Sequence, residues 1–351
     1  MQLNDLLKQT SEWLKSSGPN SEIVISSRIR LARNLDKVPF PHWANKKQGE
    51  WTTEMIYKAV SEDEYLKKSI YLKLSDLDAI DKQFLVERHL MSHEHALKPD
   101  NKAIVISEEE IVSIMINEED HLRMQVMKSG FDLSEAWNII NNIDTSLSAK
   151  LPFAFSKELG YLTACPTNAG TGMRGSVMLH LPALVMTKQI NKVLAAIAKL
   201  SFTTRGLYGE GTQAAGNFFQ ISNQVSLGQN EEEIIENIKG IIRQIIEQEN
   251  MARNALTQNN RQILEDRIYR ASGILKSAYI INSAETIEML SMLRLGQDLG
   301  IIKSIDRRLI NELFILTQPA HLQKIEGKRL NAQERDVKRA ALIRSRIGNI
   351  G

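Results

Sequence analysis

The hydrophobic positions in the first 256 residues change period several times, which predicts a mixture of helices and strands. Helical spacing predicts a short N-terminal helix within residues 1–20 and longer helices at 131–150, 183–201 and 231–256. Short apolar runs bounded by turn residues predict strands at 23–25, 103–106, 111–116, 161–164, 176–180, 203–208 and 218–226. The acidic turn Glu108-Glu109-Glu110 joins two of these strands, so we expect an antiparallel hairpin there. The elements do not follow the regular βαβ alternation of a parallel sheet.

Only helical patterns follow residue 256, and they predict a separate helical domain. The predicted helices cover 258–277, 284–299, 306–316 and 332–346. Asn331 and Glu334 form an Asn-x-x-Glu pattern that predicts a capping box at the start of the last helix. We therefore expect two domains, residues 1–255 and 256–351.

The composition is that of an ordinary folded protein, with 42% hydrophobic and 25% charged residues. Because the formal net charge is only +2, binding of a polyanion would require local clustering of arginines. The single cysteine, Cys165, excludes an internal disulfide bond. The N-terminus lacks the features of a secretory signal and no run of about 18 apolar residues occurs, so we expect a cytoplasmic protein without a membrane span.

Two charged segments follow predicted strands. In Ser26-Ser27-Arg28-Ile29-Arg30 the two arginines would project to the same face of an extended chain and could bind a phosphate together; the alternative is a solvated basic strand. The second segment is Asn117-Glu118-Glu119-Asp120-His121-Leu122-Arg123. A carboxylate beside a positive site can align and deprotonate a nucleophile, although a surface turn would have the same composition.

Two glycine-rich segments are further candidates for ligand binding. The first runs from Cys165 to Gly175 and contains a formal G-x-G-x-x-G pattern, but a predicted strand follows it and the acidic residue of a dinucleotide site is missing. Since no Walker A motif or protein-kinase signature occurs either, we interpret this segment as a loop that delivers Arg174. The second, Arg205-Gly206-Leu207-Tyr208-Gly209-Glu210, allows close approach of a ligand to the backbone or forms a plain turn.

Histidine and cysteine offer two weaker candidates. His89, His93 and His95 have metal-like spacing, but no cysteine is near and Pro99 indicates the end of a helix, so we predict no metal site there. Cys165 is either a small buried hydrophobic residue or, given its place in a ligand-like loop, a functional one.

Taken in order, these four segments resemble the catalytic domain of the phosphagen (guanidino) kinase family. The motifs SSRIR, NEEDHLR, CPTN-x-GT followed by Arg, and RG-x-x-GE extend over residues 23–256, and the ordered set is specific although each motif alone is weak. The tail segment from Arg335 to Ala340 matches the RDxxRA motif of the branch that phosphorylates arginine in proteins. The resemblance implies an α+β fold, with a largely antiparallel sheet flanked by helices and an all-α C-terminal domain.

The resemblance also assigns roles to individual residues. The implied catalytic residues are Glu119 as general base, Glu210 as clamp of the guanidinium, and Cys165; the order of the two glutamates stays open. The implied ATP-binding residues are Ser26, Ser27, Arg28, Ile29, Arg30, His89, Arg123, Arg174, Gly175, Ser176, Val177, Met178, Arg205, Gly206, Leu207, Tyr208 and Gly209. The implied allosteric receptor for phosphoarginine consists of Arg335, Asp336, Val337, Lys338, Arg339 and Ala340. ATP and Mg²⁺ are the implied cofactors, with the metal held mainly through phosphates and water.

The implied activity is transfer of the γ-phosphoryl group of MgATP to arginine in proteins, which marks them for bacterial stress-response quality control and proteolysis. The implied partners are arginine-bearing protein substrates, an activator or adaptor, Clp-type proteolytic machinery and further copies of the chain in a homodimer or larger assembly. Two departures from the kinases of small metabolites indicate an open acceptor site: only a short helix precedes Arg28, and Gly211 replaces a histidine. The alternatives are a kinase of free arginine and a nucleic-acid-binding regulator, although direct nucleic-acid binding leaves the upstream arginines unexplained.

Overall fold

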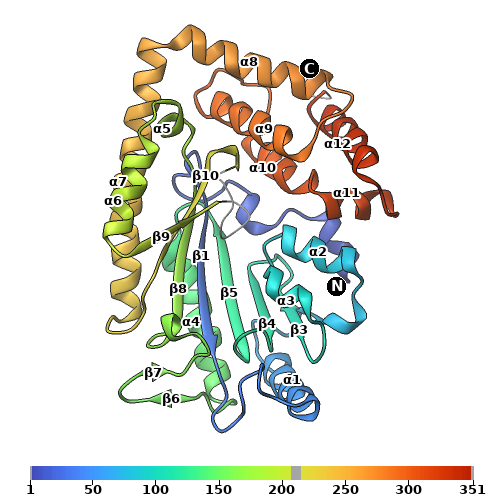
Figure 1. Cartoon of the computed structure of the whole chain (residues 1–351), viewed down its shortest axis with the longest axis vertical. Helices are drawn as coiled ribbons and strands as arrows, with labels where there is room; N and C mark the ends of the chain where they lie inside the picture. Colours follow the sequence, from blue (N-terminus) through green and yellow to red (C-terminus); the bar gives the residue numbers. More distant parts are fainter. Residues whose placement is uncertain (1, 207–214, 349–351) are drawn as a thin grey trace.

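The centre of the fold is an eight-stranded sheet in which all neighbouring strands are antiparallel (Figure 1). The computed structural model describes residues 2–206 and 215–348. The strand order is β2-β3-β4-β5-β1-β8-β10-β9. The strands are β1 (Val24–Arg33), β2 (Ile70–Lys73), β3 (Ala103–Ile106), β4 (Val112–Ile116), β5 (Leu122–Ser129), β8 (Met173–His180), β9 (Phe202–Arg205) and β10 (Phe218–Asn223), and a separate hairpin pairs β6 (Phe155–Ser156) with β7 (Gly160–Tyr161). The expected antiparallel sheet and the β3–β4 hairpin are confirmed.

Alternation of side chains along β1 gives the sheet one apolar and one charged face. Ile29 and Leu31 are fully buried, whereas Arg28 and Arg30 project to the opposite side. This confirms that the two arginines share a face, and it leaves the charged side as the one on which a ligand can bind.

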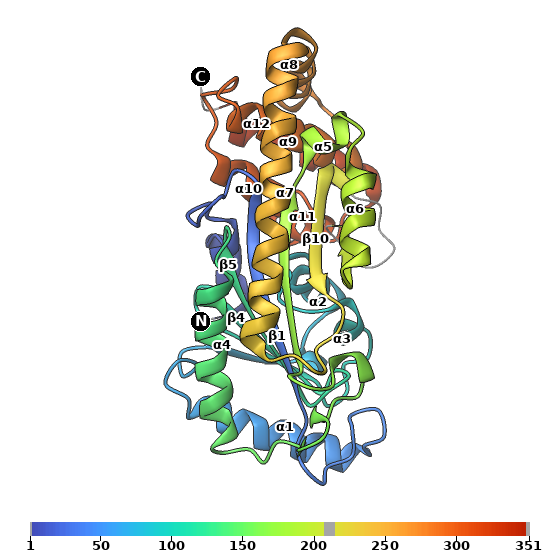
Figure 2. The same ribbon diagram turned by 90° about the vertical axis from the view of Figure 1, so that its left-hand side faces the viewer.

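Two helices cover the apolar face, namely α4 (Leu133–Ser148) and α7 (Glu231–Asn259) (Figure 2). The long helix α7 begins at a capping box of Asn230 and presents a buried isoleucine stripe to the sheet. Gly175 on β8 permits the close approach of α7, because a Cβ atom there would lie 2.5 Å from Cδ1 of Ile238.

The described chain after α7 consists of helices, which pack at one end of the sheet (Figure 1). They are α8 (Arg261–Ser277), α9 (Ser283–Asp298), α10 (Arg307–Leu316), α11 (Pro319–Glu326) and α12 (Ala332–Ile347). The predicted capping box is confirmed, since Asn331 accepts from the amide of Glu334 and Glu334 accepts from the amide of Asn331. Helix α7 continues through residue 255, so the expected boundary between 255 and 256 falls inside a helix and stays a prediction.

A buried charge network joins the helices to the sheet. Arg294 on α9 is fully buried and donates to the carbonyl of Ser21 at 2.6 Å, just before β1, and to Nδ1 of His180 at the end of β8 at 2.9 Å. Asp298 balances this charge and also accepts from Nε of Arg307 at 2.6 Å. Removing one member of such a buried set leaves an uncompensated charge, so the network fixes how the helical region docks.

Several sequence-based expectations were wrong in detail. The predicted N-terminal helix is replaced by two 3-10 helices, η1 (Leu3–Lys8) and η2 (Glu12–Leu14), and the predicted helix at 183–201 is divided because Lys188 has a φ of 59°. Its two parts are α5 (Pro182–Met186) and α6 (Ile190–Lys199). The expected strand at 161–164 keeps only its first residue, the strand at 218–226 ends at Asn223, and the end of the strand at 203–208 lies outside the described residues.

The remaining short elements were not predicted from the sequence. They are α1 (Lys46–Ser61), α2 (Ala79–Glu87), η3 (Leu74–Asp76), η4 (Pro166–Asn168) and η5 (Ala215–Asn217), together with β2 and α11. The helix end expected before Pro99 is confirmed, because α3 (His93–Leu97) ends there. Helix α11 depends on a distant residue, because the buried carboxylate of Glu87 accepts from the amides of Ala320 and His321 in its first turn. No helix among the described residues is long and apolar enough to cross a membrane.

Candidate active site

Five arginines lie on the charged face of the sheet. The register pairs Arg30 with Arg174 on β8, and Ala32 with Arg123 on β5. Gln220 on β10 pairs with Arg205 on β9, and its side-chain oxygen accepts a hydrogen bond from Nη2 of Arg28 at 3.0 Å. Residues directly opposite each other in antiparallel strands point to the same side of the sheet. The sheet thus brings together the arginines that the sequence predicted separately, which are Arg28, Arg30, Arg123, Arg174 and Arg205.

The guanidinium of Arg30 is incompletely paired among the described residues. Nε and Nη2 of Arg30 are inaccessible to solvent and have no hydrogen-bond partner among the described residues. Burial, followed by the charges of Arg28 and Arg123, holds the pKa of Arg30 well below its usual range. Burial and the neighbouring arginines likewise lower the pKa of Arg28 to about 9. An anion with several oxygens, such as a polyphosphate, would relieve this repulsion through charge-assisted hydrogen bonds.

A small hollow adjoins the arginine face at the end nearest the N-terminal segment. Its lining consists of Trp13, Ser26, Arg28, His89, Met127, Ser176, Met178 and Gln220. The rings of His89 and Trp13 meet edge to face with centroids 5.2 Å apart, and Gln125 donates to the carbonyl of His89 at 2.6 Å. Burial, with the charge of Arg28, lowers the pKa of His89 to about 4, so the ring is neutral at neutral pH. The aromatic and thioether side chains around this hollow are surfaces of the kind against which a flat base can pack.

The pleat divides the other predicted ATP-binding residues between the two faces. Ser26, Ser176 and Met178 lie on the arginine side. The other predicted residues of these two strands face the core, and they are Ser27, Ile29, Gly175 and Val177. Gly206 follows β9, and Leu207, Tyr208, Gly209 and the predicted catalytic Glu210 lie outside the described residues.

The turn between β4 and β5 lies at the other end of the arginine face, and its three carboxylates differ in burial and in hydrogen-bond partners. Glu118 accepts from Nη1 of Arg123 at 2.6 Å and from the hydroxyl of Ser92. Asp120 is buried and accepts from Nδ2 of Asn34 at 2.6 Å. Glu119 is exposed, and its pKa is raised, first by partial desolvation and then by the charge of Asp120. Glu119 is therefore the exposed carboxylate of this turn, whereas Asp120 is buried.

The Cys165 loop is held against this acidic turn. The amide of Ala164 donates to Asp120 at 2.7 Å, and the hydroxyl of Ser226 donates to the carbonyl of Ala169 at 2.9 Å. Cys165 is partly exposed, and its Sγ shares a hydrogen bond of 3.0 Å with the hydroxyl of Thr167. The structure therefore places the thiol beside the turn that carries Glu119, and not in the core.

Two models of known protein families match this chain. Residues 52–252 match the model of the ATP:guanido phosphotransferase C-terminal catalytic domain, and residues 261–351 match that of the protein-arginine kinase McsB C-terminal domain. The chain belongs to the protein-arginine kinase branch of the ATP:guanido phosphotransferase family. Within this family, a protein-arginine kinase of Halothermothrix orenii is 50% identical over 99% of both chains. One of Bacillus licheniformis is 48% identical over 96% of this chain and 93% of that protein.

Solved structures of the family share the fold. A lombricine kinase aligns with a TM-score of 0.59 at 24% identity, covering 73% of this chain and 76% of that one. A duplicated taurocyamine kinase from Schistosoma mansoni, solved with components of a transition-state analogue, aligns with a TM-score of 0.60 at 25% identity over 69% of this chain and 34% of that one.

The tail motif of this family lies on α12, and its residues differ in accessibility. Arg339 is buried and donates to the carbonyls of Thr317 at 2.8 Å and Ile281 at 3.0 Å, and also to the carboxylate of Asp336. Arg335 and Asp336 are partly exposed. The other members are Val337, which is exposed, Lys338, which pairs with Glu326 at 2.6 Å, and Ala340, which is buried.

Sequence reasoning missed the residues that support the charged groups. Trp13, Gln125 and Gln220 contact the predicted site from three separate elements. Gln125 could have been inferred, because it lies two residues after Arg123 on one strand and so faces the same side. Trp13 gave no such signal, since its 3-10 helix is placed by packing on the sheet.

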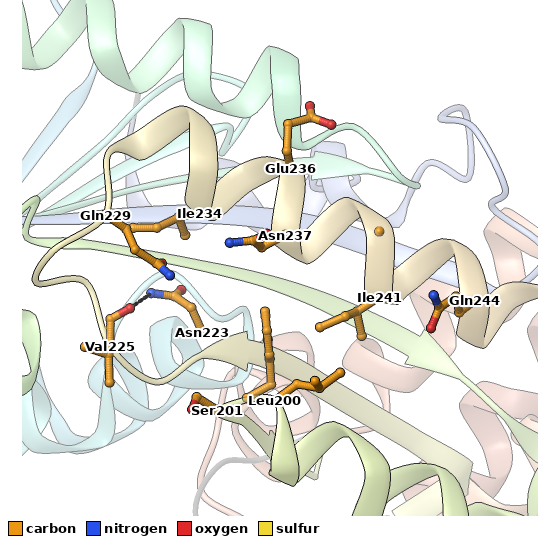
Figure 3. Close-up of a pocket in the computed structure, with 12 residues that line it drawn as sticks. Leu200, Ser201, Asn223, Val225, Gln229, Ile234, Glu236, Asn237, Ile241 and Gln244 are labelled. Carbon is orange, nitrogen blue, oxygen red and sulfur yellow. Dashed lines mark hydrogen bonds between the residues drawn. The ribbon is translucent and has the colours of Figure 1, made fainter.

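Another cleft lies on the opposite side of the sheet. It lies between α7 and the start of β9, with residues such as Leu200, Asn237 and Ile241 around it (Figure 3). Asn223 in its wall is already bonded to the amide of Gly175 at 2.8 Å and to the carbonyl of Met173 at 3.2 Å. Without cationic side chains in its lining, this cleft does not suit a polyphosphate.

Substitution by methionine should change the stability of the fold differently at Arg30 and at Arg33, two arginines of β1. Arg30→Met removes an incompletely paired charge, so the unfolding midpoint of the free protein should stay level or rise, while affinity for MgATP falls by at least about tenfold. Arg33 is buried and bonded to Asp144 at 2.8 Å, so Arg33→Met should destabilise the fold by about 3 kcal/mol or more. Denaturant unfolding with and without MgATP separates the two. Equal destabilisation, or unchanged nucleotide affinity of Arg30→Met, would contradict this description of the arginine face.

Proposed function

We propose that this chain transfers the γ-phosphoryl group of MgATP to the guanidinium of arginine residues in proteins. The observation that carries the proposal is the arginine face, with an exposed carboxylate and a thiol at one end and an aromatic hollow at the other. Relatives that match almost the whole chain bear the name protein-arginine kinase, which supports arginine in proteins as the acceptor.

ATP would lie with its base in the hollow beside His89 and its triphosphate across the arginine face. Arg28, Arg30, Arg123, Arg174 and Arg205 would bind the phosphate oxygens and hold the γ-phosphorus in line with the acceptor. Mg²⁺, when bound with ATP, would be held mainly through the phosphates and water and would supply neutralisation of the developing negative charge. The residues fit a metal held in this way, because the arginines of this face would bind phosphate oxygens and leave the metal to phosphate and water.

The acceptor requires removal of a proton. A guanidinium has a pKa above about 12, so it is a poor nucleophile unless it loses a proton as the bond to phosphorus forms. Glu119 would accept the proton, the bond between nitrogen and phosphorus would form, and the bond from phosphorus to the bridging oxygen of ADP would break. Glu210 would hold the planar fork in place through a bidentate contact, and Cys165 would orient or tune the guanidinium.

The cellular role follows from the same assignment. Phosphorylated proteins would be delivered to Clp-type proteolytic machinery during stress in the cytoplasm, with an activator or adaptor protein controlling the kinase. We also propose that copies of this chain assemble into a homodimer or a larger assembly.

The tail motif would act as a receptor for phosphoarginine. Arg335 is partly exposed and would pair with the phosphate, and Asp336 would pair with the guanidinium. Arg339 would contribute by fixing Asp336, since it donates to that carboxylate while bonded to two backbone carbonyls. Occupation of this receptor would couple phosphorylation to activity or assembly.

The catalytic assignment is tested with radiolabelled MgATP and an unstructured protein that contains arginine. We expect acid-labile label on the protein, and Glu119→Gln and Glu210→Gln should each lower the rate by about 10² or more, because the proton acceptor or clamp is lost. Glu158→Gln, an exposed glutamate in the β6–β7 hairpin, is the matched control and should retain the rate. Label on free arginine alone would indicate a metabolic kinase, and full activity of both variants would refute the assignment.

The receptor assignment is tested by equilibrium binding of free phosphoarginine. Asp336→Ala should lower the affinity by at least about tenfold, because a charge-assisted contact to the guanidinium is lost, while affinity for MgATP is retained. Lys328→Ala, at an exposed position outside the motif, serves as control. Unchanged affinity for phosphoarginine in Asp336→Ala would refute the assignment of the tail motif as a phosphoarginine receptor.

A further inference from the structure

The loop between β1 and α1 presents three aromatic rings at the surface, and we call Phe40, His42 and Trp43 the aromatic lip. The ring centroids of His42 and Trp43 are 4.6 Å apart, and those of Phe40 lie 6.0 Å from His42 and 5.9 Å from Trp43. Trp43 nevertheless remains 73% exposed. The lip is part of the blue loop at the lower edge of the molecule, below the end of β1 (Figure 1). A cluster of exposed aromatic rings on one loop is a feature of binding surfaces.

The lip is a fixed structure. The amides of Trp43 and Ala44 both donate to the carbonyl of Phe40, at 2.9 and 3.0 Å. Before the lip, the amide of Asp36 donates to the carbonyl of Pro152 at 2.7 Å. The backbone of the lip is therefore held in a turn before any partner arrives, which lowers the entropic cost of binding.

The same loop is fastened to the turn that carries Glu119. Nδ1 of His121 accepts a hydrogen bond from the amide of Leu35 at 3.0 Å. Its Nε2 therefore carries the proton and donates to the carbonyl of Pro39 at 2.9 Å. Pro39 directly precedes the lip, and His121 lies two residues after Glu119. The pKa of Glu119 agrees with this proximity: burial raises it most, and His42 is among the charges that lower it. The lip therefore borders the acceptor end of the arginine face.

We propose that the aromatic lip is a substrate subsite, which binds an apolar side chain close to the target arginine in an extended, unfolded protein segment. The proposal rests on the proposed function. An extended chain advances about 3.4 Å per residue, so when an arginine reaches Glu119, residues one to three positions away pass over the adjoining loop. Folded proteins bury their apolar side chains, so a subsite of this kind selects segments that have lost their structure.

The test compares two unstructured peptides that each contain one arginine, with leucine or glycine two residues to either side. For the wild-type protein with MgATP, kcat/KM should favour the leucine peptide by about tenfold, the usual discrimination of an apolar pocket. Trp43→Ala should reduce this ratio toward one, mainly through KM for the leucine peptide. Tyr269→Ala removes an aromatic ring that is 56% exposed on α8 and should keep the wild-type ratio.

A second measurement does not depend on phosphoryl transfer. Fluorescence anisotropy of the labelled peptides should show tighter binding of the leucine peptide by the wild type and by Tyr269→Ala, and the loss of this preference in Trp43→Ala. Equal binding of both peptides by the wild type, or an undiminished preference in Trp43→Ala, would overturn the subsite. A changed oligomeric state of Trp43→Ala in light scattering, with unchanged selectivity, would also overturn it and assign the lip to contacts between copies. Preferential binding without phosphorylation of either peptide would support the lip and refute the proposed function.

Discussion

The structure depends on a concentration of positive charge that one antiparallel sheet holds on a single face. Side chains alternate along each strand. The strands that project guanidinium groups on one side of the sheet therefore project isoleucine, valine and methionine side chains on the other. The apolar side packs under α4 and α7, and this packing stabilises the sheet against the repulsion between neighbouring arginines. Under the proposed function, a bound polyphosphate would relieve this repulsion. The site is thus prepared for its ligand before the ligand arrives, and preorganised charge of this kind is the main way in which proteins stabilise a transferring phosphoryl group.

The three acidic residues of the turn between β4 and β5 are neighbours in the sequence but differ in their contacts. In the acidic turn, Glu118 neutralises Arg123, Asp120 fastens the turn to the Cys165 loop, and Glu119 alone points outward with a raised pKa. The same turn also anchors the loop that carries the aromatic lip. The proposed proton acceptor and the proposed subsite for its flanking residues would therefore both depend on one short segment.

The sequence predicted those features that follow from local pattern. The spacing of Arg28 and Arg30 predicted their common face, and the isoleucine stripe predicted α7. The first turn of α11 could not be predicted, because its capping carboxylate, Glu87, is distant in sequence. Motif order, and not periodicity, indicated that Arg123, Arg174 and Arg205 join the site; only the register of the sheet explains why they do. The N-terminal segment was mistaken for a helix because its few apolar residues fit both a helix and the 3-10 turns that pack against the sheet.

The central claim is that phosphate is transferred to the arginine side chain of a protein. Tandem mass spectrometry of an unstructured protein after incubation with the kinase and MgATP, with samples kept away from acid, locates the modified residue directly. The account predicts that the added phosphate maps to arginine and is lost on brief exposure to acid. Phosphate on serine, threonine or tyrosine, or a protein that stays unmodified while free arginine is phosphorylated, would contradict it.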